Sequence, residues 1–250
     1  MDSISIVIPA FNEERRLTAT LTAVLAYLAQ RDWRFAEVVV VDDGSADCTA
    51  RLVREFSATH AIVRLVQNPG NRGKGYSVRH GVKQARGEWI LFSDADLSAP
   101  IEELDKLLAA AREAGASVAI GSRALDRSLI AVHQSGFREM AGRVFNLCMR
   151  ALTGLPFSDT QCGFKLFEAG AAREVFGRQR LERFGFDAEV LFIARQLGYR
   201  MVEVPVRWSH SEGTKVSMFR DSLNMFLDLL RIRWNGLRGR YRQATALRRM

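Results

Sequence analysis

The sequence predicts an α/β fold, in which helices cover both faces of a Rossmann-like, mostly parallel sheet. Segments rich in β-branched residues alternate with segments that repeat apolar residues at helical spacing, and the connections between them are short. The 250 residues are 48% hydrophobic and 26% charged, which is ordinary for a globular chain and excludes disordered, collagen-like and disulfide-stapled classes. Because ligands bind beyond the carboxyl ends of the strands in such sheets, a site is expected there.

Strands are expected in the first half of the chain at residues 3–9, 37–41, 61–67, 89–93 and 117–121. Helices are expected between them at residues 12–30, 47–59, 76–86 and 102–114. Asn12 is the expected N-cap of the first helix, because Glu13 and Glu14 suit the positive end of its dipole. The loops at residues 11–13, 42–45 and 94–96 all follow strands, so we expect them to meet at one edge of the sheet.

The second half of the chain is less regular. We expect a helix at residues 140–155, a short strand at 202–208 interrupted by Pro205, and a long helix at 218–237. Apolar residues of the last helix form one stripe: Phe219, Leu223, Phe226, Leu230, Trp234 and Leu237. The chain therefore divides into a globular body at residues 1–215 and a C-terminal amphipathic helix and tail at residues 216–250.

The formal net charge of +8 is concentrated in that tail. From Arg231 onward there are seven arginines and no acidic residue, which leaves 29 basic and 28 acidic residues in the remainder. Arginines beside an apolar stripe predict a helix that lies on an anionic membrane surface, and packing against the body or a partner protein is the alternative. A nucleic-acid partner is not expected, because few aromatic residues are interleaved with the basic ones.

The three cysteines, Cys48, Cys148 and Cys162, are odd in number and widely spaced, which predicts reduced thiols in a cytoplasmic protein. No apolar run approaches the roughly 18 to 20 residues of a membrane span, and the first residues lack a signal-peptide pattern. We therefore expect a protein that associates peripherally with the cytoplasmic face of a membrane.

Two carboxylates, Asp94 and Asp96, directly follow the strand expected at residues 89–93. Oxygen ligands suit Mg²⁺ or Mn²⁺, and such an ion often takes its remaining ligands from phosphates. A turn or a cap is the alternative for an isolated Asp-x-Asp. The position at a strand end favours a metal site that neutralises a departing diphosphate.

Two further loops can bind parts of a nucleotide. The acids of Asp-Asp-Gly-Ser at residues 42–45 can accept from a ribose or a base, or can close an Asx turn. Asn-Arg-Gly-Lys-Gly at residues 71–75 offers Arg72, Lys74 and backbone N–H groups to a phosphate. The Walker spacing and the Gly-x-Gly-x-x-Gly of nicotinamide enzymes are both absent.

The order of several motifs carries a family resemblance. Ile-Pro-Ala-Phe-Asn-Glu at 8–13, Val-Asp-Asp-Gly-Ser at 41–45, the loop at 71–75 and Asp-Ala-Asp-Leu at 94–97 resemble the family 2 inverting glycosyltransferases, which have the GT-A fold. Further motifs are similar to those of the polyprenyl- and dolichyl-phosphate hexosyltransferases, with dolichyl-phosphate β-glucosyltransferase as the closest branch. These motifs are Gly-Ser-Arg-Ala at 121–124, Asp-Thr-Gln-Cys-Gly-Phe-Lys-Leu-Phe at 159–167, Arg-Phe-Gly-Phe-Asp-Ala-Glu at 183–189 and Glu-Gly-Thr-Lys at 212–215.

The resemblance implies a role for each matching position. The nucleotide sugar would be bound by Pro9, Ala10, Phe11, Glu13, Val41, Asp43, Lys74, Asp94, Ala95, Asp96 and Arg123. Asp94 and Asp96 would hold Mg²⁺ or Mn²⁺. The catalytic residues would be Asp96, Asp159, Arg123 and Lys215, with Arg123 and Lys215 contacting phosphates. Where the mannosyl branch typically has an arginine and Gly-Glu-Ser-Lys, this chain has His210 and Gly-Thr-Lys at 213–215, which favours glucose.

The acceptor decides whether a general base is needed. A hydroxyl group must lose a proton, whereas a lipid monophosphate is already anionic. Asp159 is the candidate base or acceptor-organising group, and an ion pair with Lys165 or an arginine is the alternative. Arg138 and Arg143 are candidates to bind the acceptor phosphate, with solvated surface positions as their alternative.

The favoured function is therefore transfer of a hexose, with UDP-glucose as the expected donor, to a polyprenyl or dolichyl monophosphate at the membrane. The alternatives are GDP-mannose, UDP-GlcNAc or UDP-galactose as donor, or a hydroxyl acceptor on a glycan.

Overall fold

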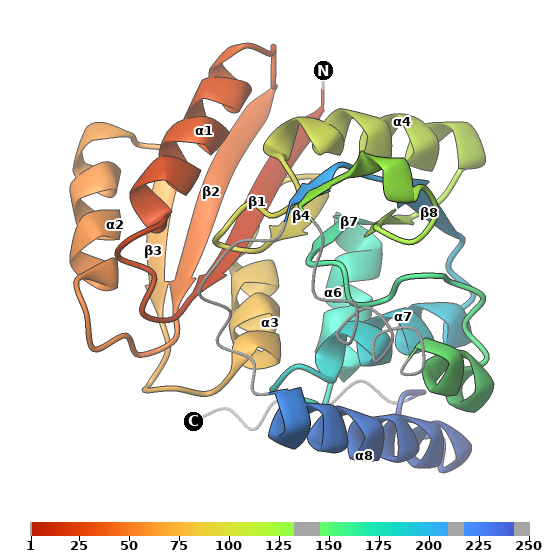
Figure 1. The fold of residues 1–250 in the computed structure, drawn as a ribbon. Coiled ribbons are helices and arrows are strands. Elements are labelled where there is room, and N and C mark those ends of the chain that lie inside the picture. The colour runs from red at the N-terminus through yellow and green to blue at the C-terminus, as the bar shows by residue number, and fades with distance from the viewer. Residues whose placement is uncertain (1, 133–145, 210–217, 243–250) are drawn as a thin grey trace.

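The computed structural model describes residues 2–132, 146–209 and 218–242 (Figure 1). Within these residues, a seven-stranded sheet has the order β3-β2-β1-β4-β7-β5-β8. Its strands are β1 (Ser3–Ala10), β2 (Phe35–Asp42), β3 (Val63–Gln67), β4 (Trp89–Ser93), β5 (Val118–Ser122), β7 (Phe164–Glu168) and β8 (Met201–Pro205). Two short strands, β6 (Ile130–Val132) and β9 (Trp208–Ser209), pair with each other beside it.

Helices cover both faces of the sheet, as the sequence predicted. One face packs against α1 (Leu17–Ala29), α2 (Thr49–Thr59) and α4 (Leu104–Ala114). The other packs against α3 (Lys74–Gln84), α6 (Ala169–Arg178) and α7 (Phe186–Gln196). The final helix, α8 (Met218–Leu237), lies on the outside of α7 (Figure 1). A helical segment at 146–153 and the short turns η1 (Ile101–Glu103) and η2 (Arg127–Leu129) complete the elements.

The apolar strands are buried on both faces, which explains their continuous β-branched sequences. In β1, the fully buried Ile4, Ile6 and Ile8 belong to the core beneath α1 and α4. The alternate residue Val7 belongs to the core on the opposite face, together with Val39 of β2. Because successive side chains of a strand point to opposite faces, one strand supplies both cores.

Parallel pairing brings three loops to one edge of the sheet. β1 pairs in parallel with β2 and with β4, and Ala10 is opposite Asp42 at the end of the first pair. The chain therefore leaves β1, β2 and β4 on the same side of the sheet. This confirms the expected clustering of the loops at residues 11–13, 42–45 and 94–96.

Two local expectations were wrong. Asn12 is not the N-cap of α1: Arg16 occupies the cap position, and Asn12 has a φ of 53°. The Asn12 side-chain oxygen instead accepts a hydrogen bond from the backbone N–H of Ala46 (2.8 Å). The segment at residues 156–200, to which no element was assigned, contains β7, α6 and α7, and β7 runs antiparallel between β4 and β5.

Candidate active site

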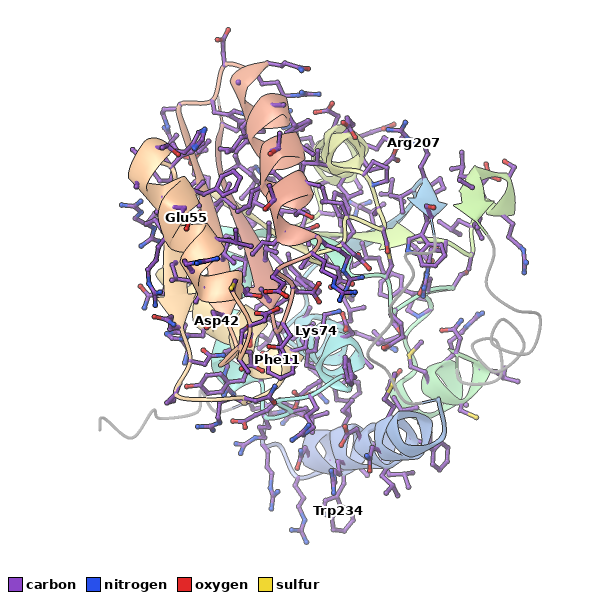
Figure 2. The ribbon with its side chains drawn as sticks, turned by 60° about the vertical axis from the view of Figure 1, so that its left-hand side comes forward. Phe11, Asp42, Glu55, Lys74, Arg207 and Trp234 are labelled. Carbon is purple, nitrogen blue, oxygen red and sulfur yellow. The ribbon has the colours of Figure 1, made fainter. Side chains whose placement is uncertain are left out.

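The loops after β1 and β2 are joined by hydrogen bonds at the carboxyl edge of the sheet. The backbone N–H of Asn12 donates to the Ser45 hydroxyl (2.9 Å), and that of Glu13 donates to the Thr49 hydroxyl (2.7 Å). Figure 2 shows Phe11, Asp42 and Lys74 close together at this edge. Residues that the sequence predicted for the site, from three different elements, therefore meet at this edge.

Asp94 directly follows β4, where its side chain and its backbone each have a partner. Its Oδ1 atom is 2.7 Å from the Lys74 ammonium, which comes from the first turn of α3. Its backbone N–H donates to the carbonyl of Gly163 (3.1 Å). A Cβ atom on Gly163 would overlap the Asp94 carboxylate, so glycine is the residue that leaves room for it.

The Asp96 carboxylate lies two residues further along the same loop. Its Oδ1 accepts from the backbone N–H of Ser98 (3.0 Å), and its Oδ2 is 3.8 Å from the Arg16 guanidinium. The side chains of Asp94 and Asp96 are 33% and 24% exposed, so solvent and ligands reach both.

This donor set fits a divalent cation that keeps water and phosphate ligands. Two accessible carboxylates are present, and in the described part of the chain no three or more His, Cys, Asp or Glu side chains gather as a closed metal cage. Mg²⁺ is commonly bound in this way, through one or two carboxylates together with substrate phosphates.

Lys74 keeps its charge at this edge. Burial alone would lower the pKa of Lys74, but the carboxylates of Asp94, Asp187 and Asp96 outweigh burial and raise it. The ammonium group therefore remains available to an anionic ligand.

Asp43 anchors the glycine-rich loop, defined here as residues 68–75. Its Oδ1 accepts from the Asn68 amide (2.7 Å) and the Arg72 backbone N–H (2.9 Å), and its Oδ2 from the Gly73 backbone N–H (2.7 Å). These two backbone N–H groups are thus bound to Asp43, although the sequence suggested that they would face a phosphate. A carboxylate has about four acceptor positions, so Asp43, which is 3% exposed, has one position that these three donors do not fill.

Arg123 and Asp159 form a forked ion pair beside this edge. The guanidinium donates from Nε (2.6 Å) and Nη2 (2.9 Å), and the Arg123 backbone N–H donates to the same carboxylate (3.1 Å). Burial alone would raise the pKa of Asp159, but Arg123 outweighs burial and lowers it. Asp159 is therefore the arginine-paired carboxylate that the sequence left as an alternative, and it is a weak base.

Comparisons with known proteins agree with the motifs. The profile of Glycosyl transferase family 2 matches residues 5–175. A dolichyl-phosphate beta-glucosyltransferase of Drosophila melanogaster is 39% identical over 97% of this chain and 78% of its own length. The Homo sapiens protein of the same name is 37% identical over 96% of this chain and 77% of its own length.

The chain belongs to glycosyl transferase family 2. The fold agrees with this assignment: a glucosyl-3-phosphoglycerate synthase from Mycobacterium tuberculosis, solved with Mn²⁺, UDP-glucose and phosphoglyceric acid, superimposes with a TM-score of 0.65. The two sequences are 20% identical, and the match covers 93% of this chain and 80% of the synthase chain. The predicted GT-A-like architecture is thereby confirmed.

A buried ion pair of this glycosyltransferase lies close to the Lys74–Asp94 pair. Lys165, the second residue of β7, is fully buried, and its ammonium binds the Asp187 carboxylate of α7 and the Cys162 carbonyl. The Asp187 carboxylate also raises the pKa of Lys74. Both residues belong to motifs of the sequence, but neither was predicted to lie at the site. A lysine among the apolar residues of 164–167 was the available signal, because buried lysines need a partner.

The remaining predicted residues of the glycosyltransferase lie near this edge with different degrees of access. Pro9, Phe11 and Glu13 are half-buried. Ala10 and Ala95 are buried, and the Ala95 carbonyl accepts from the Thr20 hydroxyl (2.6 Å). Val41 is fully buried in the core beneath α3, so it has no surface for a ligand in this structure, and its role in holding the base stays a prediction.

Three predicted residues, Arg138, Arg143 and Lys215, lie outside the described residues. Cys162 is buried, and burial raises the pKa of its thiol to about 12, so the thiol stays protonated. Cys48, Cys148 and Cys162 are all unpaired.

Proposed function

We propose that this glycosyltransferase transfers glucose from UDP-glucose to a polyprenyl or dolichyl monophosphate, with inversion at the anomeric carbon and with Mg²⁺ or Mn²⁺. The observation that carries the proposal is the cluster of Asp94, Asp96 and Lys74 beside the glycine-rich loop that Asp43 anchors. The names of the relatives support the lipid acceptor, and the similarly folded synthase crystallised with Mn²⁺ and UDP-glucose supports the donor.

Each group at the edge has a place in this reaction. Asp43 accepts from the uracil ring with its one unfilled acceptor position. Asp94 and Asp96 hold the cation, which when bound neutralises charge on the diphosphate. Lys74 and Arg16, already placed against these two carboxylates, add positive charge where the leaving UDP becomes more anionic.

The state of Asp159 favours a phosphate acceptor over a hydroxyl acceptor. A hydroxyl must lose its proton to a base, but Arg123 holds the pKa of the Asp159 carboxyl below its usual range. A lipid monophosphate is already an anion and needs positioning instead. We therefore assign Asp159 the organising role: it fixes Arg123 so that the guanidinium can face phosphate oxygens.

The surface of α8 supports a membrane location for the acceptor. Its exposed side carries Phe226, Leu227, Leu230, Trp234 and Leu237, which are between 38% and 66% exposed. The Arg238 guanidinium stacks over the Trp234 ring at 4.3 Å, and Figure 2 shows Trp234 pointing away from the body. Apolar residues flanked by arginines suit an anionic lipid interface. Among the described residues, no helix is both long and apolar enough to cross a bilayer.

A transfer assay tests the proposal. Purified protein, Mn²⁺ and a short polyprenyl phosphate are incubated separately with labelled UDP-glucose, GDP-mannose, UDP-GlcNAc and UDP-galactose. We expect label from UDP-glucose in an organic-extractable, acid-labile product, and none when unphosphorylated polyprenol replaces the phosphate. Transfer from another donor would correct the sugar. Label released only as free sugar would overturn the lipid-phosphate acceptor.

A further inference from the structure

The carboxylate of Glu189 joins two distant parts of the chain. No contact with substrate was predicted for this residue. Glu189 is fully buried in α7. Its Oε2 accepts from the backbone N–H groups of Arg180 (3.0 Å) and Leu181 (2.8 Å). Its Oε1 accepts from the hydroxyl of Tyr241 (2.7 Å), a residue just after α8 that is only 1% exposed. One side chain thus links the end of α8 to the segment at 179–182.

The segment at 179–182 in turn supports the glycine-rich loop. The Gln179 amide donates to the carbonyl of Gly75 (2.9 Å), and the Glu182 carbonyl accepts from the backbone N–H of Tyr76 (3.0 Å). A Cβ atom on Gly73 would lie 2.5 Å from the Glu182 carbonyl oxygen. The two backbones are therefore in direct contact, and a shift of one must move the other.

Charged side chains reinforce this contact. The Glu182 carboxylate pairs with Arg72 of the glycine-rich loop and with Arg79 of α3, both at 3.2 Å. Gly73, on the same loop, donates to Asp43. Glu189 is therefore connected to Asp43 through the segment at 179–182 and the glycine-rich loop.

We propose that Glu189 is a positioning residue for the donor nucleotide. It fixes the segment at 179–182, which holds the glycine-rich loop against Asp43, and Tyr241 ties this support to α8. The inference rests on the proposed use of a uridine nucleotide donor. It also connects α8 to the residues proposed to bind the donor.

Glu189→Ala removes the support and leaves the backbone N–H groups of Arg180 and Leu181 without this acceptor. We expect the Kd for UDP with Mn²⁺, measured by calorimetry on the full chain, to rise about tenfold, with the KM for UDP-glucose rising in parallel. The kcat should stay within about threefold, because the reacting groups are not touched. Glu189→Gln should restore the wild-type Kd to within about twofold, because its amide oxygen still accepts from both N–H groups.

Glu37 provides the matched control. It is another buried glutamate, 1% exposed, which accepts from the Ser5 hydroxyl (2.7 Å) and the Arg86 backbone N–H (2.7 Å). It lies near the start of β2, at the opposite edge of the sheet from the site. Glu37→Ala should lower stability as Glu189→Ala does, but should leave the Kd for UDP unchanged.

Tyr241→Phe keeps the packing and removes one hydrogen bond, so it tests the proposal even where Glu189→Ala does not fold. We expect it to weaken UDP binding about threefold. An unchanged Kd in folded Glu189→Ala, or in Tyr241→Phe where the alanine variant does not fold, would overturn the proposal, as would equal weakening by Glu37→Ala. Wild-type protein that binds UDP but transfers nothing to polyprenyl phosphate would refute the acceptor alone. Wild-type protein that binds no UDP would refute both.

Discussion

At the scale of single residues, the site depends on contacts that leave little room for change. Gly163 is the clearest case, because its missing side chain is the space occupied by the Asp94 carboxylate. No pattern in the sequence singles out this glycine within its motif. Only the antiparallel placement of β7 beside β4 brings residue 163 against residue 94.

Gly163→Ala should displace the Asp94 carboxylate without removing it. We expect the Mn²⁺ concentration needed for half-maximal activity to rise at least about tenfold, with a smaller change in the melting temperature. Gly177→Ala is the control, because a Cβ atom on this α6 residue meets nothing within 4 Å. It should raise stability by about 0.5–1 kcal/mol and leave metal activation unchanged. Wild-type metal activation in Gly163→Ala would contradict the proposed metal site.

The pH dependence of the free energy of unfolding should reveal the titration of Glu189. Burial raises the pKa of its carboxyl from 4.5 to about 7. The folded protein therefore holds this proton more tightly than the unfolded chain, and the resulting stability is present below about pH 4.5 and is lost as the pH rises to about 7. Glu189→Gln cannot titrate, so wild-type protein should lose up to about 3 kcal/mol relative to it over this range. Urea unfolding of both proteins at about pH 5 and about pH 8 measures the difference, and a constant difference would refute the shift.

At the scale of elements, α8 has two faces with different roles. Leu229 and Ile232 are buried in the core shared with α7, while the side from Phe226 to Leu237 is exposed. The sequence predicted the limits of this helix, residues 218–237, and the four stripe residues from Phe226 onward are exposed. The side chains of Phe219 and Leu223 lie outside the described ones. Membrane association and packing on the body were set as alternatives, but the two faces allow α8 to do both.

Substitution on the exposed face tests the membrane role. Trp234→Glu combined with Leu237→Glu should abolish binding to vesicles that contain anionic lipid, because it removes apolar area and adds negative charge. Ala58→Glu combined with Thr59→Glu, on exposed positions at the end of α2, adds the same charge and should leave binding intact. Sedimentation with vesicles measures both. Equal binding by the two variants would contradict the role of α8. Deletion of the tail is a poorer test, because it also removes the buried Tyr241.

Element prediction succeeded where the chain repeats a simple pattern and failed where pairing is non-local. Strand β4 and helix α8 were located residue for residue, because a short apolar run and a regular stripe define them. Strand β7 was missed because Lys165 interrupts its apolar sequence, and the partner that neutralises this lysine, Asp187, comes 22 residues later. Helix α1 was started too early because Asn12 resembles a cap, although it holds the next loop instead.

At the scale of the whole molecule, the fold concentrates chemistry at one edge of the sheet and amphipathic surface on one helix. The alternation of apolar segments predicted the fold, and the order of the motifs predicted the family and the loops that meet at the edge. The partners of those residues were not predictable, since hydrogen bonds such as Gly73 to Asp43 depend on contacts between loops that the sequence does not specify. The hydrogen bonds by which Glu189 links Tyr241 to the segment at 179–182 were not predictable for the same reason.

Asp94 and Asp96 are proposed to promote glucose transfer to a lipid phosphate. The most direct measurement is the rate at which labelled UDP-glucose and polyprenyl phosphate yield organic-extractable product, for wild-type protein with and without EDTA and for Asp94→Asn and Asp96→Asn. We predict that EDTA and each substitution lower the rate by at least about a hundredfold, while the variants remain folded by circular dichroism. A rate unaffected by EDTA and by both substitutions would contradict the claim.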